Sequence, residues 1–450
     1  MKRYITLFML LCSLGVASAQ TTLKSAYFMD RMTTRHKINP ALMSEYGYFA
    51  LPALGDINVG INSNLSVDKL VFPLDNGDLG LFAHPDVDSS EFLSGLKDDN
   101  VISQELNLTL LSMGFYGFGG YNTIDLSVRE TLDINIKKSL FEFLVGSDSG
   151  NSVYDMAGTS VDLNSWAELS FGHAHRINDH LTIGVKLKYL MGAATANVEI
   201  DKMTFESTSD HILIDAHASG TAAMVGMQLS GLMDDISFDT FDMASISNSG
   251  FAVDFGATYE LNKFNFAIAM TDLGYINWTN PSTVETGVSS YFGGFENADL
   301  DNFDESTEDQ LNDFTSPFEE IEDITFSPTD AYRTSLYAKL NIAAEYQICK
   351  TLSAGVLYTS TFGPTTTTEL MLAATYSPAT WFDIALSGTT SSYGTYWGWA
   401  LNFCPRAINF FIGMDRMVAS ITPQGVPYSS SNLNLKMGLS IPLGKIHTAN

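Results

Sequence analysis

The chain has 450 residues and a formal net charge of −28, from 51 acidic and 23 basic side chains. Such an acidic protein would repel nucleic-acid phosphates, so nucleic acid is not expected as a partner. Beyond the first twenty residues only Cys349 and Cys404 remain, which excludes a disulfide-built scaffold.

Residues 1–19 have the features of a secretory signal peptide. Lys2 and Arg3 give a charged start, an apolar run follows, and small residues end at Ala19 before Gln20. No later stretch reaches the roughly eighteen uncharged apolar residues of a spanning helix. We therefore expect cleavage at about Ala19/Gln20 and export of the mature chain.

The segment 20–46 shows little strand periodicity and is basic. Proline disfavours helix at the residue before it, so an extended or turned conformation is expected at its centre. The residues alone leave two alternatives open, a plain tail and a plug folded into an acidic lumen. The residues that suggest the plug are Arg31, Arg35, Lys37, Asn39, Pro40 and Ala41.

The clearest strand pattern lies in 166–191. From Leu181 to Met191 apolar and polar residues alternate without a break, and Glu168, Lys186 and Lys188 fall on the polar face. About ten alternating residues are the length of a tilted strand that crosses a bilayer, with its polar face toward the lumen. A three-residue loop at 177–179 would place Glu168 opposite Lys188.

Similar segments recur to the end of the chain, about fifteen in all. In the second half the tight connections alternate with longer ones, of which 276–332 is the longest. Outer-membrane barrels have short periplasmic turns and long extracellular loops. The pattern predicts an all-β fold, a transmembrane antiparallel β-barrel over 47–450. A short helix is expected within 137–146. Strand alternation places the side chains of Cys349 and Cys404 inward, and because several strands separate them along the wall, we expect both to be free thiols.

The connection 276–332 is strongly acidic, and 296–330 contains no Lys or Arg. Carboxylates at this density suggest Ca²⁺, or divalent ions shared with lipopolysaccharide, but the spacing of a calcium-binding loop is absent. A solvated extracellular loop is favoured. No catalytic, cofactor-binding or metal-ligand pattern is found, so we expect no cofactor and no enzyme activity.

The signal peptide, the Asn39-Pro40-Ala41 motif and the hairpins over 47–443 resemble outer-membrane barrels of the long-chain fatty-acid transporter (FadL-like) type and PorV- and PorQ-like barrels. The segment Tyr27-Phe28-Met29 and the hairpin Ala174–Leu190 resemble an uncharacterised group of exported barrels from Bacteroides-type bacteria. The resemblance implies about 14 strands, an N-terminal lumen plug at 20–46, and the outer membrane of a Gram-negative bacterium.

Two functions are expected. The first is transport or binding of hydrophobic or amphipathic small molecules; the alternative is an interaction barrel that binds envelope or secreted proteins. Outer-membrane lipid and lipopolysaccharide are expected partners in both. We also expect the cations of the plug to meet inward acids, namely Asp254, Glu260 or Glu345, and apolar side chains to interrupt a polar lumen. These are Leu190, Leu273, Tyr337, Leu357, Met371 and Phe411.

Overall fold

A computed structural model describes most of the chain. The described residues are 23–65, 70–73, 79–82, 88–145, 151–208, 212–225, 231–232, 248–292, 324–363, 366–405, 407–417 and 433–443. The expected signal peptide and most of the acidic stretch 296–330 lie outside them. Among the described residues no helix has the length and hydropathy needed to cross a membrane.

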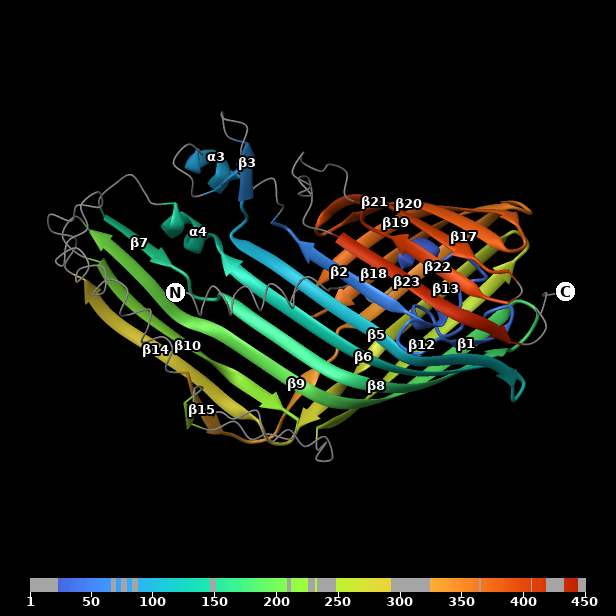
Figure 1. The fold of residues 1–450 in the computed structure, drawn as a ribbon, viewed down its shortest axis with the longest axis horizontal. Coiled ribbons are helices and arrows are strands. Elements are labelled where there is room, and N and C mark those ends of the chain that lie inside the picture. Colours follow the sequence, from blue (N-terminus) through green and yellow to red (C-terminus); the bar gives the residue numbers. More distant parts are fainter. Residues whose placement is uncertain are drawn as a thin grey trace.

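Fourteen antiparallel strands close into a barrel (Figure 1), which confirms the expected fold class. β1 (Gly47–Ala50) and β2 (Ile57–Ser63) together form the first strand, and β23 pairs with both of them and with β22. The others are β5 (Asp99–Gly117), β6 (Gly120–Lys137), β8 (Ser160–Arg176), β9 (Leu181–Thr208), β12 (Ser249–Leu261), β13 (Phe264–Trp278), β17 (Ala338–Cys349), β18 (Leu352–Phe362), β19 (Thr367–Ala379), β20 (Phe382–Ser391), β21 (Gly394–Phe403), β22 (Asn409–Met414) and β23 (Leu433–Leu443).

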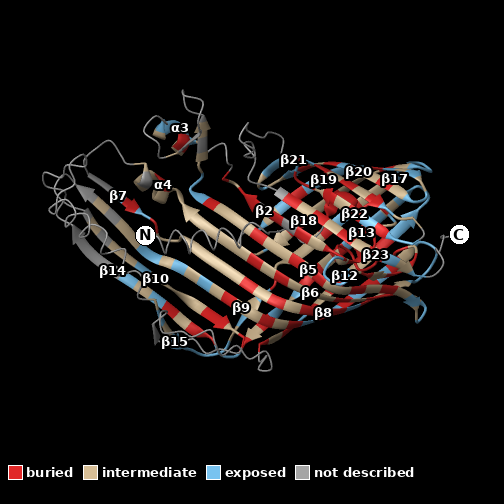
Figure 2. Ribbon diagram, in the orientation of Figure 1, coloured by how far each residue is buried: buried red, intermediate tan, exposed pale blue. Residues whose placement is uncertain are grey.

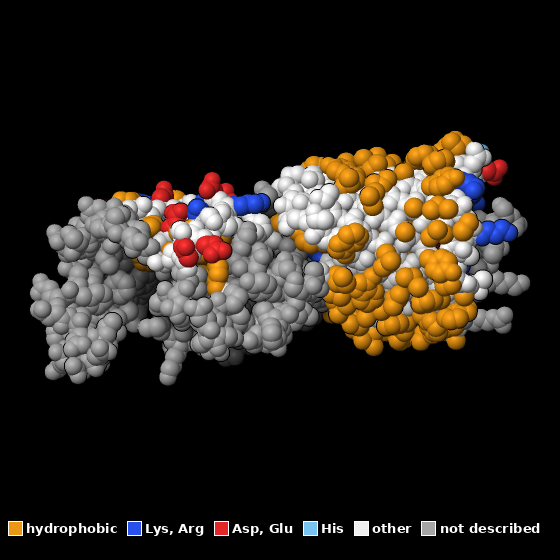
Figure 3. Space-filling view, turned by 90° about the horizontal axis from the view of Figure 1, so that it is seen from above, with side chains coloured by type: hydrophobic (Ala, Val, Ile, Leu, Met, Phe, Trp, Pro, Cys, Tyr) orange, Lys and Arg blue, Asp and Glu red, His pale blue; other side chains and the backbone are white. Residues whose placement is uncertain are grey.

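The barrel strands alternate between a buried inner face and an exposed outer face (Figure 2). The outer face is apolar: Leu187, Phe251 and Leu372 are 61%, 63% and 63% exposed. Figure 3 shows hydrophobic side chains spread over the face of the barrel wall that it displays. The inner face is largely polar, so the usual arrangement of a soluble protein is reversed. An apolar surface of this extent requires lipid to cover it.

One side of the barrel continues into an open sheet (Figure 1). The first part of β9 pairs with β12, and its second part pairs with β10 (Ile212–Met224). The remaining strands of this extension are β7 (Asn151–Asp155), β11 (Gly231–Leu232), β14 (Ser282–Phe292) and β15 (Thr325–Pro328).

The extension corrects the expectation that 276–332 is simply a loop, because β14 and β15 lie within it. β14 runs beside β10 from Ile212↔Phe292 to Ala222↔Ser282. Its sequence has few apolar residues to alternate, so the signal for a strand is weak. The partner strand, more than fifty residues earlier, supplies the hydrogen bonds that define it.

Smaller elements lie outside the barrel wall. β3 (Val71–Pro73) and β4 (Leu79–Leu81) form a hairpin near α3 (Ser89–Ser94), which Asp88 caps through the Ser90 and Glu91 amides. α4 (Lys138–Leu144) occupies the expected helical position. Phe92 packs against the rings of Phe82 and Phe141, which joins the two helices. In contrast, β16 (Tyr332–Ser335) belongs to the wall, where it pairs with the end of β13.

Two β-bulges reverse the expected facing of side chains. In β13, Thr271 and Asp272 both oppose Asp254, and Asp272 has a φ of 60°, so Leu273 points outward and is 37% exposed. A second register shift, between Gln347 and Cys349, leaves Cys349 exposed and not inward. An extra residue shifts the two-residue alternation by one position, and the composition of the strand does not indicate where this happens.

The expected free thiols can be distinguished by their accessibility. Cys349 is exposed, whereas the Cys404 Sγ lies 2.8 Å from the Tyr46 hydroxyl and is partly buried. We expect maleimide to label Cys349 rapidly and Cys404 slowly in the folded barrel, and both after unfolding. Mass spectrometry of unreduced, alkylated protein measures this; a bridged 349–404 peptide would contradict the free thiols.

Candidate functional site

The inner wall of the barrel accommodates the N-terminal residues 23–46, which include the 3-10 turns η1 (Lys24–Ala26) and η2 (Arg35–Lys37). Nineteen of its 24 residues are buried. Four wall glycines leave the space that it occupies. The close pairs are Gly184 with Pro40, Gly256 with Asn39, Gly355 with Phe28, and Gly413 with Leu23.

The Asn39-Pro40-Ala41 motif forms an elbow against two of these glycines. Gly184 of β9 and Gly256 of β12 are directly paired in the wall. A Cβ atom on Gly256 would lie 2.0 Å from Asn39 Oδ1, and one on Gly184 would lie 2.3 Å from the Pro40 carbonyl. Asn39 Oδ1 accepts the Ala41 amide hydrogen at 2.9 Å, which fixes the turn.

Cations of the segment form ion pairs with acids on several strands. Lys24 meets Glu369 of β19, and Arg31 meets Asp383 of β20. Lys37 Nζ lies 2.7 Å from the Asp56 carboxylate, which Lys436 of β23 also contacts at 3.0 Å. The His36 ring lies 3.2 Å from the Asp125 carboxylate of β6.

Two of the three acidic partners named from sequence were wrong, whereas Glu345 lies within electrostatic reach of Arg35. Asp254 pairs with Lys188, and Glu260 pairs with Arg176 at 3.2 Å. Arg35 contacts Asp30 of its own segment at 2.7 Å. Charge balance alone predicted that these cations meet acids; which acids depends on strand order and stagger, which periodicity does not reveal.

The segment packs with its apolar side chains on one half of the wall. Met371 and Phe411 contribute to this surface, among small residues such as Ala373, Ala385 and Ala400. Because alanines line this side, the segment can approach the backbone of the strands closely. The apolar side chains of the segment in these two clusters are Leu23, Ala26, Tyr27, Phe28, Met29, Met32, Ile38 and Leu42.

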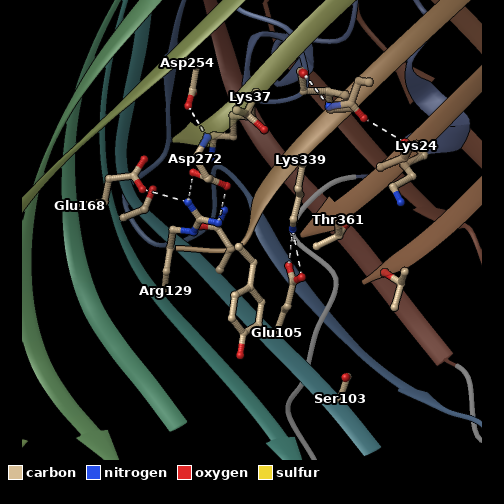
Figure 4. Close-up of a pocket in the computed structure, with 18 of the residues that line it drawn as sticks. Lys24, Lys37, Ser103, Glu105, Arg129, Glu168, Asp254, Asp272, Lys339 and Thr361 are labelled. Atoms are coloured by element: carbon tan, nitrogen blue, oxygen red, sulfur yellow. Dashed lines mark hydrogen bonds and ion pairs between the residues drawn. The ribbon is translucent and has the colours of Figure 1, made fainter. Parts of the chain in front are cut away.

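The opposite half of the lumen carries a buried charge layer built from five strands. It comprises Arg129, Glu168, Asp254 and Asp272, which Figure 4 labels, together with Lys188. The Arg129 guanidinium donates to Glu168 at 2.9 Å and to both Asp272 oxygens at 2.8 and 3.0 Å. Lys188 Nζ lies 2.6 Å from Asp272 and 2.8 Å from Asp254. Paired charges of this kind hold one another in place, because each would be costly to bury alone.

The central hairpin differs in register from the sequence expectation. Ser170 is opposite Lys188, and Glu168 is opposite Leu190, because Arg176 pairs with Thr182 across a longer turn. The shift is two residues, so each side chain keeps its facing. Glu168 and Lys188 still meet, diagonally, at 3.8 Å, and Lys186 Nζ lies 3.2 Å from Asp125.

An apolar layer follows the charge layer toward the long-loop end of the barrel. The next inward residues beyond Glu168, Lys188 and Asp254 are apolar, and Ile276 and Trp278 of β13 lie beyond Asp272 in the same way. The Arg129 guanidinium carbon lies 5.1 Å from the Trp166 ring centre, which joins the two layers. The layer comprises Trp166, Leu190, Ala223, Ala252, Ile276, Trp278 and Leu336.

Sequence reasoning placed Leu190 inward but missed the rest of this layer. Trp166 lies two residues before Glu168 and therefore faces the same side of the strand, so its inward position could have been predicted from the sequence. Trp278 and Ile276 lie beyond the Asp272 bulge, where parity could not be followed.

The described residues leave little open space in this part of the lumen. A cavity of about 80 Å³ lies beside the charge layer, where Lys37, Glu105, Arg129 and Lys339 contribute to its lining. Small-molecule pockets are usually roughly 300–1,000 Å³. In the described part of the chain no group of three or more His, Cys, Asp or Glu side chains is arranged to hold a metal ion.

A closed barrel with an apolar outer wall and a charged lumen defines an outer-membrane β-barrel. The chain belongs to the family of unknown function DUF5723, whose model matches residues 40–415. No curated protein matches the sequence.

Solved structures with a similar arrangement include two toluene transporters and a FadL homologue. TbuX of Ralstonia pickettii is 8% identical, with a TM-score of 0.42 over 92% of this chain and 93% of that one. TodX of Pseudomonas putida is 8% identical, with a TM-score of 0.38 over 95% of this chain and 94% of that one. A Pseudomonas aeruginosa FadL homologue is 8% identical, with a TM-score of 0.41 over 96% of this chain and 100% of that one. Likeness of this degree gives no information on cargo.

Proposed function

We propose that the protein binds and transports amphipathic or hydrophobic small molecules across a Gram-negative outer membrane, and that residues 23–46 close its lumen at rest. Export by a cleaved signal peptide is part of this proposal, as is the absence of enzyme activity. The expected link to Bacteroides-type and PorV-like barrels stays a prediction.

The stacking of the apolar layer on the charge layer carries the proposal. An amphipathic molecule needs a surface for its hydrocarbon and a partner for its polar group, close together. Trp166 and Trp278 offer the first, and Arg129 and Lys188 the second. On binding, Arg129 and Lys188 would exchange their ion pairs with Asp272 and Glu168 for contacts with the polar group of the ligand.

Closure by the N-terminal segment is supported by its contacts with opposite sides of the wall. The glycines at Gly184 and Gly256 match the Asn39-Pro40-Ala41 elbow in shape, and acids at Asp56, Glu369 and Asp383 match the cations of the segment in charge. A tail without a role would not require glycine at these wall positions.

Organic extraction of the detergent-purified barrel, followed by mass spectrometry, tests the cargo class. We expect an amphipathic small molecule in the wild type and a loss of about tenfold or more in Trp278→Ala, since a buried aromatic anchor contributes much of a binding free energy. Trp397→Ala is the control, because Trp397 is 67% exposed on the outer wall.

Equal extraction from Trp278→Ala and the wild type would contradict binding at the apolar layer. Recovery of a stable protein partner, with no small molecule from any variant, would favour the alternative of an interaction barrel.

A further inference from the structure

The outer wall has an apolar hollow that the lumen function does not use. It lies across β12, β13, β17 and β18 and has a volume of about 430 Å³. Ala257, Ala344 and Val356 are among its shorter side chains, while Phe266 and Ile268 stand beside them, 43% and 51% exposed. The short side chains leave a recess between longer ones, on a surface that lipid must cover.

Aromatic side chains locate this hollow relative to the membrane surface. Tyr259 lines the turn-side end of the hollow, and Phe264 and Tyr346 lie between it and the tight turns, with their ring centres 4.8 Å apart. They are 44%, 46% and 39% exposed. Belts of exposed aromatics mark the level of lipid headgroups. The hollow therefore opens to the acyl chains of the leaflet on the short-turn, periplasmic side.

Two lysines lie beyond the aromatic belt, in the turns of the same four strands. Lys263 belongs to the β12–β13 turn and Lys350 to the β17–β18 turn, and both are exposed. The turns are adjacent, since Lys263 Nζ donates to the Ile348 carbonyl at 3.4 Å. Glu260, the nearby acid, is already paired with Arg176.

Figure 3 shows a few Lys and Arg side chains at this end of the barrel, and others farther along the molecule. In a chain with a net charge of −28, exposed cations beside an apolar recess form a distinct local feature.

We propose that this hollow binds one acyl chain of an anionic glycerophospholipid, whose phosphate meets Lys263 and Lys350. A chain seated in the recess gains dispersion contacts that a flat wall does not offer, and this packing is the main source of contact energy in a membrane. The lysines add selectivity for negative headgroups. The site is independent of any cargo in the lumen.

Native mass spectrometry of the full-length barrel, from nanodiscs with equal phosphatidylglycerol and phosphatidylcholine, tests the site. We expect one retained phosphatidylglycerol on the wild type. Ala257→Phe, which fills the hollow, should lose it, whereas Ala374→Phe, on the exposed outer face of β19, should keep it. Each of Lys263→Gln and Lys350→Gln should lower the preference for phosphatidylglycerol by about fivefold.

Equal retention of the two lipids by the wild type would overturn the proposed headgroup contact. Retention by Ala257→Phe equal to that of Ala374→Phe would overturn the proposed recess. If Ala257→Phe fails to assemble, the lysine variants still decide the matter, and an unchanged preference in both of them would refute the site.

Discussion

Deletion of residues 22–44 is expected to convert a closed barrel into a conducting one. The segment packs on one half of the lumen and pairs with acids on the other, through Lys37 with Asp56 and His36 with Asp125. Without it, a wall of fourteen strands would enclose a water-filled path, lined by polar side chains on one half and by small apolar ones on the other. Single-barrel conductance in planar bilayers measures the change.

A point substitution tests the same closure with the segment still present. Gly256→Val would place side-chain atoms where Asn39 and Pro40 lie, since even a Cβ atom would be 2.0 Å from Asn39 Oδ1 and 2.9 Å from Pro40 Cδ. We expect intermittent or permanent opening. Gly388→Val is the control, because the nearest atom to a Cβ there belongs to the Trp397 side chain, at 3.3 Å, and not to the N-terminal segment.

Unchanged conductance in the assembled deletion variant would contradict closure by this segment. If Gly388→Val raised conductance as much as Gly256→Val, substitution of any strand glycine would have this effect. The contact between Gly256 and the Asn39-Pro40-Ala41 elbow would then no longer support closure.

Arg129→Gln is expected to lower the free energy of unfolding by about 3–5 kcal/mol, because it leaves buried carboxylates without their guanidinium. Asp272 would retain Lys188, and Glu168 would retain only its 3.8 Å contact with the same lysine. Urea unfolding in lipid vesicles, followed by tryptophan fluorescence, measures the loss.

Two further variants separate charge from packing. Lys202→Gln breaks an exposed pair with Asp215 in the open sheet and should change stability by less than about 1 kcal/mol. The double variant Arg129→Gln, Asp272→Asn should regain part of the loss, because fewer charges stay uncompensated. If the double variant loses as much unfolding free energy as Arg129→Gln and Asp272→Asn lose together, the lost packing of Arg129 on Trp166 explains the effect instead.

Local periodicity was enough to predict a membrane barrel, its approximate number of strands and the facing of Glu168, Lys186 and Lys188. Side chains alternate with a period of two along any strand, so facing can be read without knowing the partner strand. The same logic failed at Leu273 and Cys349, where a bulge adds one residue. It also missed β14, whose definition as a strand depends on β10.

The basic composition of residues 20–46 and the Asn39-Pro40-Ala41 motif were visible in the sequence, but their contacts were not. Which acid meets Lys37, or why Gly184 and Gly256 must be glycines, follows only when strands distant in the chain lie side by side. Arg129 and Asp272 are 143 positions apart and form one charge layer. The alternation of side chains is a property of one strand, so it determines which side of the wall a residue faces. Which residues meet across the lumen is decided only by the closed barrel, because strand stagger and bulges set the position of each residue along the barrel axis.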